Sequence, residues 1–236
     1  MKDRKKIRSK INYPGWELKY FDKSNNFRNY QLFLIKKYLE KDVAEVGPGN
    51  GRNLTGYIHL PKKIDLYEPS KNLFLNLKKN FKRHKKISFF NKTFNNSRKK
   101  YNAILYLDVL EHIKNDRVEI IKAIKSLKEG GYLIINVPAF SFLYSKFDKD
   151  VGHHRRYSKS DFKKVLVGLD FKKVNYVYYD TIGFLLSLLS KVLISNYKKN
   201  FEKKLKLWDS MIWISKIFDL ITFRFFGKSL LVIIKK

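Results

Sequence analysis

The chain has no cysteine among its 236 residues, and it has no long uninterrupted apolar segment. The first absence excludes disulfides and thiolate metal ligands. The second argues against a membrane span, which needs roughly 20 consecutive apolar residues. The basic first ten residues lead into no apolar stretch, so a secretory signal is not expected either. Together these absences predict a cytoplasmic protein.

Acidic residues are scarce. The chain carries 21 Asp and Glu against 51 Lys and Arg, a formal net charge of +30. Residues 71–100 contain eleven basic residues and no acid. Only ten of the basic residues are Arg, and Lys is the poorer of the two for bidentate recognition of phosphates or bases. We therefore interpret the charge mainly as a solvated surface. Attraction to an anionic membrane surface is the next alternative, and binding of nucleic acid is the third.

Short apolar segments alternate with amphipathic ones, which predicts a doubly wound, mostly parallel α/β sheet. The expected strands are residues 42–46, 64–67, 87–90, 101–107, 132–137, 171–178 and 229–234. The expected helices are residues 26–40, 52–59, 72–81, 116–127 and 160–167, with a turn at 128–131. We expect a single domain with four parts: an N-terminal cap region (1–40), an α/β core (41–178), an apolar helical insertion (179–226) and a final strand (227–236).

The most specific feature is a glycine-rich turn directly after the first strand. Gly47, Gly49 and Gly51 are spaced two apart, and Glu45 stands two residues before the first of them. Glycine has no Cβ, so such a turn lets the backbone approach a nucleotide-like ligand closely. A dinucleotide-binding fingerprint would need its third glycine at position 52, which is Arg52. The pattern therefore argues against an NAD site.

This E-x-G-x-G-x-G pattern resembles motif I of the class I S-adenosylmethionine-dependent methyltransferases, and the resemblance covers about residues 40–178. It implies a Rossmann-like fold with S-adenosylmethionine as the cofactor. Glu45 and the glycine turn would hold the amino-acid end of the cofactor, whose carboxylate would face the backbone N–H groups at the helix start. Glu68, followed by Pro69, lies 23 residues beyond Glu45, where the family places an acid that accepts hydrogen bonds from the ribose hydroxyls.

Two further segments carry the resemblance. Asp108 and Val109 follow the fourth strand in a segment that looks like the family's motif IV, and they would line the cofactor near its methionine portion. His112, four residues on, is expected to be a packing or capping residue. In residues 91–97, where many relatives carry an acid or polar group for the adenine edge, this chain has no acid. Phe94 or a backbone group is expected to take that role.

A Gly-His-His-Arg-Arg-Tyr segment, residues 152–157, follows the fifth strand. It is similar to a G-H-x-R-R-Y segment of a bacterial subgroup of class I enzymes, the generic type 11 and 12 methyltransferases. His154 or His153 is a candidate general base near neutral pH, and Asp108 is an alternative. No metal is expected, because adjacent histidines rarely ligate together and no matching carboxylate cluster accompanies them.

The rest of this segment is a candidate for acceptor binding. Arg155 or Arg156 would bind an anionic group such as phosphate or carboxylate, with Tyr157 beside them. The alternative is that Arg156 and Tyr157 only brace the loop before the next helix, together with Asp150.

Residues 181–226 do not belong to a minimal fold of this kind. Residues 182–194 and 206–226 are apolar on most helical faces, so they must be buried or lie in lipid. Four alternatives stay open for them: they cover the substrate side, pair with a second subunit in a homodimer, lie in a membrane interface, or pack on the domain's own core.

We expect an S-adenosylmethionine-dependent methyltransferase that acts on a small or lipid-like acceptor, O- or N-directed, by in-line methyl transfer. The apolar insertion favours an acceptor presented at a membrane, with the protein peripheral at its inner face. One alternative is an RNA-modifying methyltransferase that uses the basic surface. Another is a non-catalytic cofactor-binding or membrane-adaptor protein that has kept the fold.

Overall fold

The computed structural model describes residues 12–95, 99–192 and 198–236. Its centre is a sheet of seven strands in the order β3-β2-β1-β4-β5-β7-β6. β1 to β5 pair in parallel, and β7 runs antiparallel between β5 and β6. The prediction of a doubly wound, mostly parallel sheet is confirmed. The strands are β1 (Asp42–Val46), β2 (Lys63–Tyr67), β3 (Ile87–Phe90), β4 (Tyr101–Leu107), β5 (Leu127–Pro138), β6 (Lys173–Tyr179) and β7 (Ser229–Lys235).

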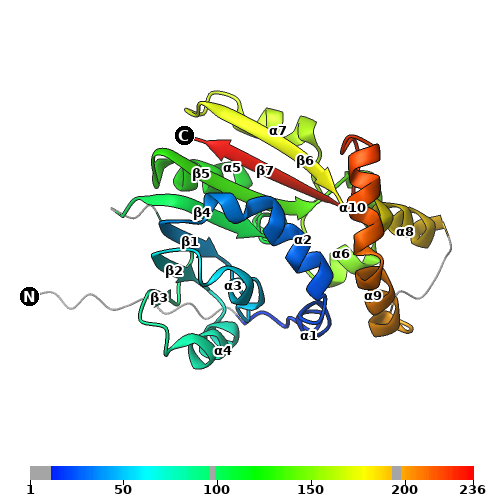
Figure 1. The fold of residues 1–236 in the computed structure, drawn as a ribbon, viewed down its shortest axis with the longest axis horizontal. Coiled ribbons are helices and arrows are strands. Elements are labelled where there is room, and N and C mark those ends of the chain that lie inside the picture. The colour runs from blue at the N-terminus through cyan, green and yellow to red at the C-terminus, as the bar shows by residue number, and fades with distance from the viewer. Residues whose placement is uncertain (1–11, 96–98, 193–197) are drawn as a thin grey trace, which may run out of the picture.

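Helices cover both faces of the sheet, as Figure 1 shows. On one face, a core cluster takes in buried side chains of α5 (Asp116–Lys125) and α7 (Lys159–Leu166). On the other face, the cluster draws on α2 (Asn25–Ile35), α3 (Arg52–Tyr57) and α4 (Lys71–Phe81). The buried residues of α4 lie four apart and form one apolar stripe that faces the core: Leu73, Leu77 and Phe81.

Because β1, β2, β4 and β5 are parallel, the loops that follow them emerge at one edge of the sheet. These loops carry the glycine turn, Glu68, Asp108 and the His-Arg segment. Four short helical elements lie in or beside them: α1 (Leu18–Phe21), η2 (Leu110–His112), η3 (Ser141–Leu143) and α6 (Lys146–Asp150).

The described residues between β6 and β7 form three helices, so the prediction of a helical insertion before the last strand is confirmed. They are α8 (Thr181–Val192), α9 (Phe201–Ser210) and α10 (Ile212–Ile221), and they gather at one end of the sheet (Figure 1). Hydrogen bonds to two buried acids join these helices to one another and to α2. Asp219 accepts hydrogen bonds from the Thr181 amide at 2.9 Å and the Tyr30 hydroxyl at 2.7 Å, and Asp180 accepts one from the Trp208 indole at 2.8 Å.

None of the helices in the described part of the chain is both long enough and apolar enough to cross a bilayer.

Some predicted boundaries differ from those observed. The helix predicted over residues 26–40 ends at Ile35 and continues as a 3₁₀ turn, η1 (Lys36–Tyr38). The turn predicted at 128–131 is part of β5, whose first residue Leu127 pairs with Tyr101 before a register shift. The apolar segment 206–226 is divided at Met211 between α9 and α10. Residues 193 and 194 of the other predicted apolar segment lie outside the described residues.

Candidate functional site

The three glycines of the turn all adopt positive φ angles, of 67°, 58° and 81° for Gly47, Gly49 and Gly51. A Cβ on Gly47 would lie 2.7 Å from Val109 Cγ2, and one on Gly51 would lie 2.5 Å from Phe81 Cε2. A Cβ on Gly49 would meet only Leu18 Cδ1, at 3.9 Å. Two of the glycines are therefore required by packing, whereas Gly49 presents its backbone to open space.

Glu45 is buried at the end of β1, where it accepts a hydrogen bond from the Tyr57 hydroxyl of α3. Burial raises the pKa of Glu45 to about 7, against the opposing effects of this hydrogen bond and the Arg28 charge. Arg28, on α2, donates to Asn53 Oδ1 and to the Phe21 carbonyl. Its positive charge acts on both Glu45 and Asp108. Arg28 would therefore suit a cofactor carboxylate, and no local motif marks it in the sequence.

Glu68 lies directly after β2 and reaches back to the glycine turn. Its Oε2 accepts a hydrogen bond from the Gly49 amide at 3.0 Å, and its Oε1 accepts one from the Ser70 amide at 2.8 Å. Burial raises the pKa of Glu68 to about 7 although both hydrogen bonds oppose the shift. Each oxygen retains a second lone pair for a ribose hydroxyl. Asn91 fixes the neighbouring backbone by donating to the carbonyls of Glu68 and Pro69, at 2.9 and 3.2 Å.

Asp108 follows β4 with a positive φ of 58°. Its Oδ1 accepts a hydrogen bond from Asn136 Nδ2 at 2.7 Å, and Asn136 Oδ1 accepts one from the Tyr179 hydroxyl at 2.9 Å. The residue is exposed to solvent, yet protein atoms surround its carboxyl closely enough to raise its pKa by desolvation. Val109 packs against Gly47, so this segment borders the glycine turn.

Phe94 is placed differently from the prediction. Its ring is fully buried and meets the ring of Tyr67 edge-on, with centroids 5.0 Å apart. Tyr101 and Tyr106 also surround it. The structure therefore makes Phe94 part of the core and leaves its ring no open face for adenine.

The His-Arg segment is organised by a buried acid, Asp148 of α6. Arg156 donates to both Asp148 oxygens at 2.9 Å, and His153 Nδ1 lies 2.8 Å from Asp148 Oδ1. These partners hold the pKa of Asp148 well below its usual range, although its burial acts in the opposite direction. Arg156 is only 8% exposed, so its guanidinium braces the loop. The bracing acid is Asp148; the acid suggested by the sequence, Asp150, is 3.4 Å from Lys198 instead.

Arg155 and Tyr157 are held in a similar way. Arg155 Nη1 and the Tyr157 hydroxyl both donate to Asp116 Oδ2, at 2.8 and 3.0 Å. Tyr157 is buried. Arg155, Arg156 and Tyr157, the three predicted acceptor-binding residues, thus all bind acids of the protein itself. This arrangement corresponds to the alternative in which the segment only braces its loop.

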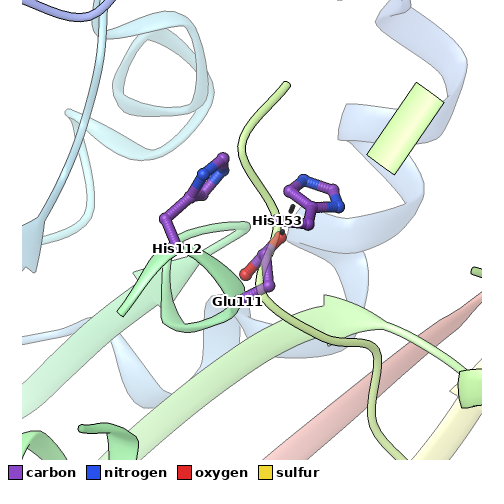
Figure 2. A group of neighbouring side chains, drawn as sticks. All are labelled: Glu111, His112 and His153. Carbon is purple, nitrogen blue, oxygen red and sulfur yellow. Dashed lines mark ion pairs between the residues drawn. The ribbon is translucent and has the colours of Figure 1, made fainter. Parts of the chain in front are cut away.

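The two candidate histidines are separated by the fold. His154 is exposed, and its backbone amide donates to the Glu111 carbonyl at 2.8 Å. His153 points inward and meets Glu111 and His112 of η2, as Figure 2 shows. Burial is the main cause that lowers the pKa of His112 to about 4, and it raises the pKa of Glu111 well above its usual range. The sequence analysis missed Glu111, because nothing local pairs it with a histidine 42 residues away.

Residues before α2 cover this edge of the sheet. The Tyr13 hydroxyl donates to Glu17 Oε1 at 2.8 Å, and its ring meets the His112 ring edge-on at 5.7 Å. Trp16 contacts Phe147 of α6 and Phe201 of α9, with centroids 6.2 and 5.5 Å apart. The N-terminal segment therefore packs against η2, α6 and α9.

Lys228 is a further residue that no sequence pattern marked. Its Nζ lies 3.8 Å from the centroid of the Trp208 ring. Burial lowers its pKa, while the charges of Asp180 and Asp108 oppose the shift. Its amino group therefore lies near enough to Asp180 and Asp108 to interact with both carboxyl groups.

The glycine turn, the acid after the adjacent strand and the acid after β4 define a nucleotide-type cofactor site at the carboxyl edge of a parallel sheet. A family model of the methyltransferase domain matches residues 19–176. The chain belongs to this family, and it is an S-adenosylmethionine-dependent methyltransferase. No curated protein matches the sequence.

Solved structures share the fold at low sequence identity. An S-adenosylmethionine-dependent methyltransferase from Archaeoglobus fulgidus has a TM-score of 0.62 and 16% identity, with 93% of this chain and 97% of that chain covered. The N-methyltransferase NodS from Bradyrhizobium japonicum, in complex with S-adenosylhomocysteine, has a TM-score of 0.58 and 13% identity, with 96% and 93% covered. Phosphoethanolamine N-methyltransferase 2 from Haemonchus contortus has a TM-score of 0.61 and 14% identity, with 94% of this chain and 57% of that chain covered.

The residues present fit S-adenosylmethionine. Gly49 leaves open space beside a backbone amide, and Glu68 retains lone pairs for the ribose. Arg28 and Glu45 lie close enough to interact, and they would suit the carboxylate and the ammonium of the methionine portion. The cofactor predicted from the sequence is confirmed.

Proposed function

We propose that this methyltransferase acts on a small, lipid-like acceptor presented at an anionic membrane surface, with the protein peripheral at the cytoplasmic face. The observation that carries the proposal is a set of exposed apolar side chains on α8, on α10 and on the residues just after α10. The two helices pack against each other. We call this set of side chains the outer apolar surface: Leu185, Leu188, Leu189, Trp213, Ile217, Phe218, Leu220, Ile221, Phe223 and Phe225. Large exposed apolar patches on monomers are typical of protein or membrane contacts.

The charges around this surface favour a membrane over a protein partner. Of the acids in residues 198–226, Asp209 and Asp219 are buried, and Glu202 is paired with Lys23 and Lys206. The exposed basic residues here and on α8 are Lys191, Lys198, Lys199, Lys203, Lys204, Lys206 and Lys216. Helices that expose both basic residues and apolar or aromatic side chains are typical of interfacial helices on anionic lipid.

The same insertion also borders the acceptor side of the site. The rings of Phe201 and Trp208 on α9 contact Phe21, and Phe201 contacts Phe147. Phe184 of α8 contacts Phe140 after β5. One side of the insertion thus lies against the site and the other is exposed and apolar, which supports an acceptor that enters from a lipid surface. The complex of the Haemonchus contortus enzyme with phosphomonomethylethanolamine supports a small acceptor.

In the proposed reaction, bound S-adenosylmethionine supplies an electrophilic methyl group. The protein contributes alignment and removal of water from the acceptor nucleophile. Asp108 is the residue we assign to accept a proton from an acceptor hydroxyl or amine. Asn136 fixes its position, and the raised pKa of its carboxyl makes it a better base than an ordinary aspartate near neutral pH.

Liposome flotation at low salt tests the membrane part. We expect the full chain to float with vesicles containing phosphatidylglycerol and not with vesicles of phosphatidylcholine alone. Leu220→Ser should reduce flotation, whereas Leu75→Ser on α4 should leave it unchanged; these leucines are 66% and 55% exposed. Absence of flotation would overturn the proposal. So would a homodimer that Leu220→Ser dissociates without any effect of lipid.

A further inference from the structure

Glu111, His112 and His153 form a compact group beside the methyl-transfer site. Glu111 and His112 belong to η2, directly after β4, and His153 comes from the loop after α6. Each residue offers one ligand atom, and these atoms lie within 4.8 Å of one another. Figure 2 shows the two imidazole rings on either side of the Glu111 side chain. The group joins two segments that are far apart in the sequence.

The ring of His153 is held in the orientation that a metal ligand needs. Its Nδ1 lies 2.8 Å from Asp148 Oδ1, and Asp148 is itself fixed by Arg156. In the neutral imidazole this contact places the proton on Nδ1, so the lone pair of Nε2 faces Glu111. A carboxylate behind a histidine is the usual outer partner of a metal-bound imidazole.

Glu111 supplies a second, independent observation. It is only 1% exposed, and its Oε2 finds no hydrogen-bond donor among the residues that the structure describes. Its Oε1 lies 3.9 Å from His153 Nε2, which is too long for a hydrogen bond. A buried polar oxygen without a donor calls for a partner, and a cation between Glu111 and the two histidines would supply one.

We propose that Glu111, His112 and His153 bind a divalent transition-metal ion of the Zn²⁺ or Co²⁺ type. Two imidazoles and one carboxylate are a ligand set that such ions accept, with a further position open to water or to an oxygen of the acceptor. Ligand bonds of about 2.1 Å require donor atoms about 3.4 Å apart, so side-chain rotations must draw the group together. No sequence pattern predicts a metal here, because only the folded chain brings His153 to Glu111.

Metal titration of the full chain tests this proposal without acceptor or cofactor. The protein is first stripped with a chelator and then titrated with Co²⁺, followed by visible absorption. We expect about one Co²⁺ per chain, displaced by Zn²⁺. Glu111→Gln and His112→Gln should each lower the affinity by at least about 100-fold, and Asp148→Asn by about 10- to 100-fold. Zn²⁺ should raise the thermal unfolding midpoint of the wild type more than that of any of these three variants.

Surface histidines are the main source of adventitious binding. His59 and His84 are exposed and lie on other parts of the molecule, so the double variant His59→Gln, His84→Gln should bind Co²⁺ as the wild type does. Circular dichroism establishes that each variant is folded. The proposal is overturned if the wild type shows no Co²⁺ band. It is equally overturned if folded Glu111→Gln or His112→Gln binds Co²⁺ with wild-type affinity, or if the double variant loses the binding.

Discussion

The two halves of the site are built by different means. The cofactor half, formed by the loops after β1 and β2, consists largely of backbone: Glu68 is held by the amides of Gly49 and Ser70. The half that we assign to the acceptor consists of side chains from η2, α6 and the loop after it, the N-terminal segment and α9. There Asp148 is held by Arg156 and His153.

This difference determines how each half responds to change. A site built from backbone depends on a few positions where only glycine fits, and most side chains around it can vary. A site built from side chains of distant segments depends on buried polar partners, and removing one partner leaves the others unpaired. The acceptor half should therefore be the more easily damaged by a single polar substitution.

The strongest test of this contrast is Asp148→Ala. It leaves Arg156 buried without its carboxylate, and breaking such a pair costs about 3–5 kcal/mol of unfolding free energy. The matched control is Asp161→Ala. Both residues complete a capping box with a serine, Ser145 and Ser158, but only Asp148 also binds Arg156. The control should cost about 1 kcal/mol. Urea denaturation measures both, and equal losses would contradict the contrast.

The cofactor half could be predicted from the sequence because its parts are local. The spacing of Gly47, Gly49 and Gly51 places three positive φ angles in one turn, and an acid at a fixed distance identifies Glu68. Asp108 follows from the end of a strongly apolar strand. Each of these is a short pattern whose geometry depends on a few adjacent residues.

The acceptor half could not be predicted in the same way. The His-Arg segment has the composition of a binding site, yet its arginines and Tyr157 serve internal acids, because Asp148 and Asp116 lie next to them only in the folded chain. Likewise, Glu111 meets His153 and Tyr13 meets His112 across long sequence separations. Phe94 occupies the predicted adenine segment, but neighbouring tyrosines draw it into the core.

Glycine substitutions test whether the cofactor half depends on a few positions where only glycine fits. Gly51→Ala places a methyl group 2.5 Å from Phe81 at a φ of 81°, so it should lower the unfolding free energy by about 2–4 kcal/mol. Gly49→Ala has space for its methyl group and should cost only about 1–2 kcal/mol. Its main effect should be weaker binding of S-adenosylhomocysteine, measured by isothermal titration calorimetry. A larger loss of stability for Gly49→Ala would contradict the assignment of Gly49 to the ligand.

Glu68→Gln keeps the size of the side chain and removes its charge. Hydrogen bonds to a charged acceptor contribute about 1.5–3 kcal/mol, so the dissociation constant of S-adenosylhomocysteine should rise about 10- to 100-fold. Asp65→Asn is a useful comparison, because Asp65 lies on β2, three residues before Glu68, but pairs with Lys99 instead of the glycine turn. Calorimetry should find that Asp65→Asn binds S-adenosylhomocysteine about as tightly as the wild type does. An equal loss of affinity in both variants would contradict the assignment of Glu68 to the ribose.

The pH dependence of cofactor affinity is the smallest effect and the most specific to Glu68. Its pKa is about 7 in the free protein, against 4.5 for an ordinary glutamate. Below pH 7 the Glu68 carboxyl group of the free protein is mostly protonated, and this proton must leave before the carboxylate can accept hydrogen bonds from the ribose hydroxyls. The dissociation constant should therefore fall about tenfold between pH 6 and pH 8. By the same linkage, the raised pKa makes the free protein less stable as pH rises from 4.5 through 7, because the unfolded chain has already lost this proton. Calorimetry from pH 6 to pH 8 measures how the dissociation constant depends on pH, and Glu68→Gln should remove most of this dependence. A pH dependence that persists in Glu68→Gln would assign the titration to Glu45, whose pKa is also about 7.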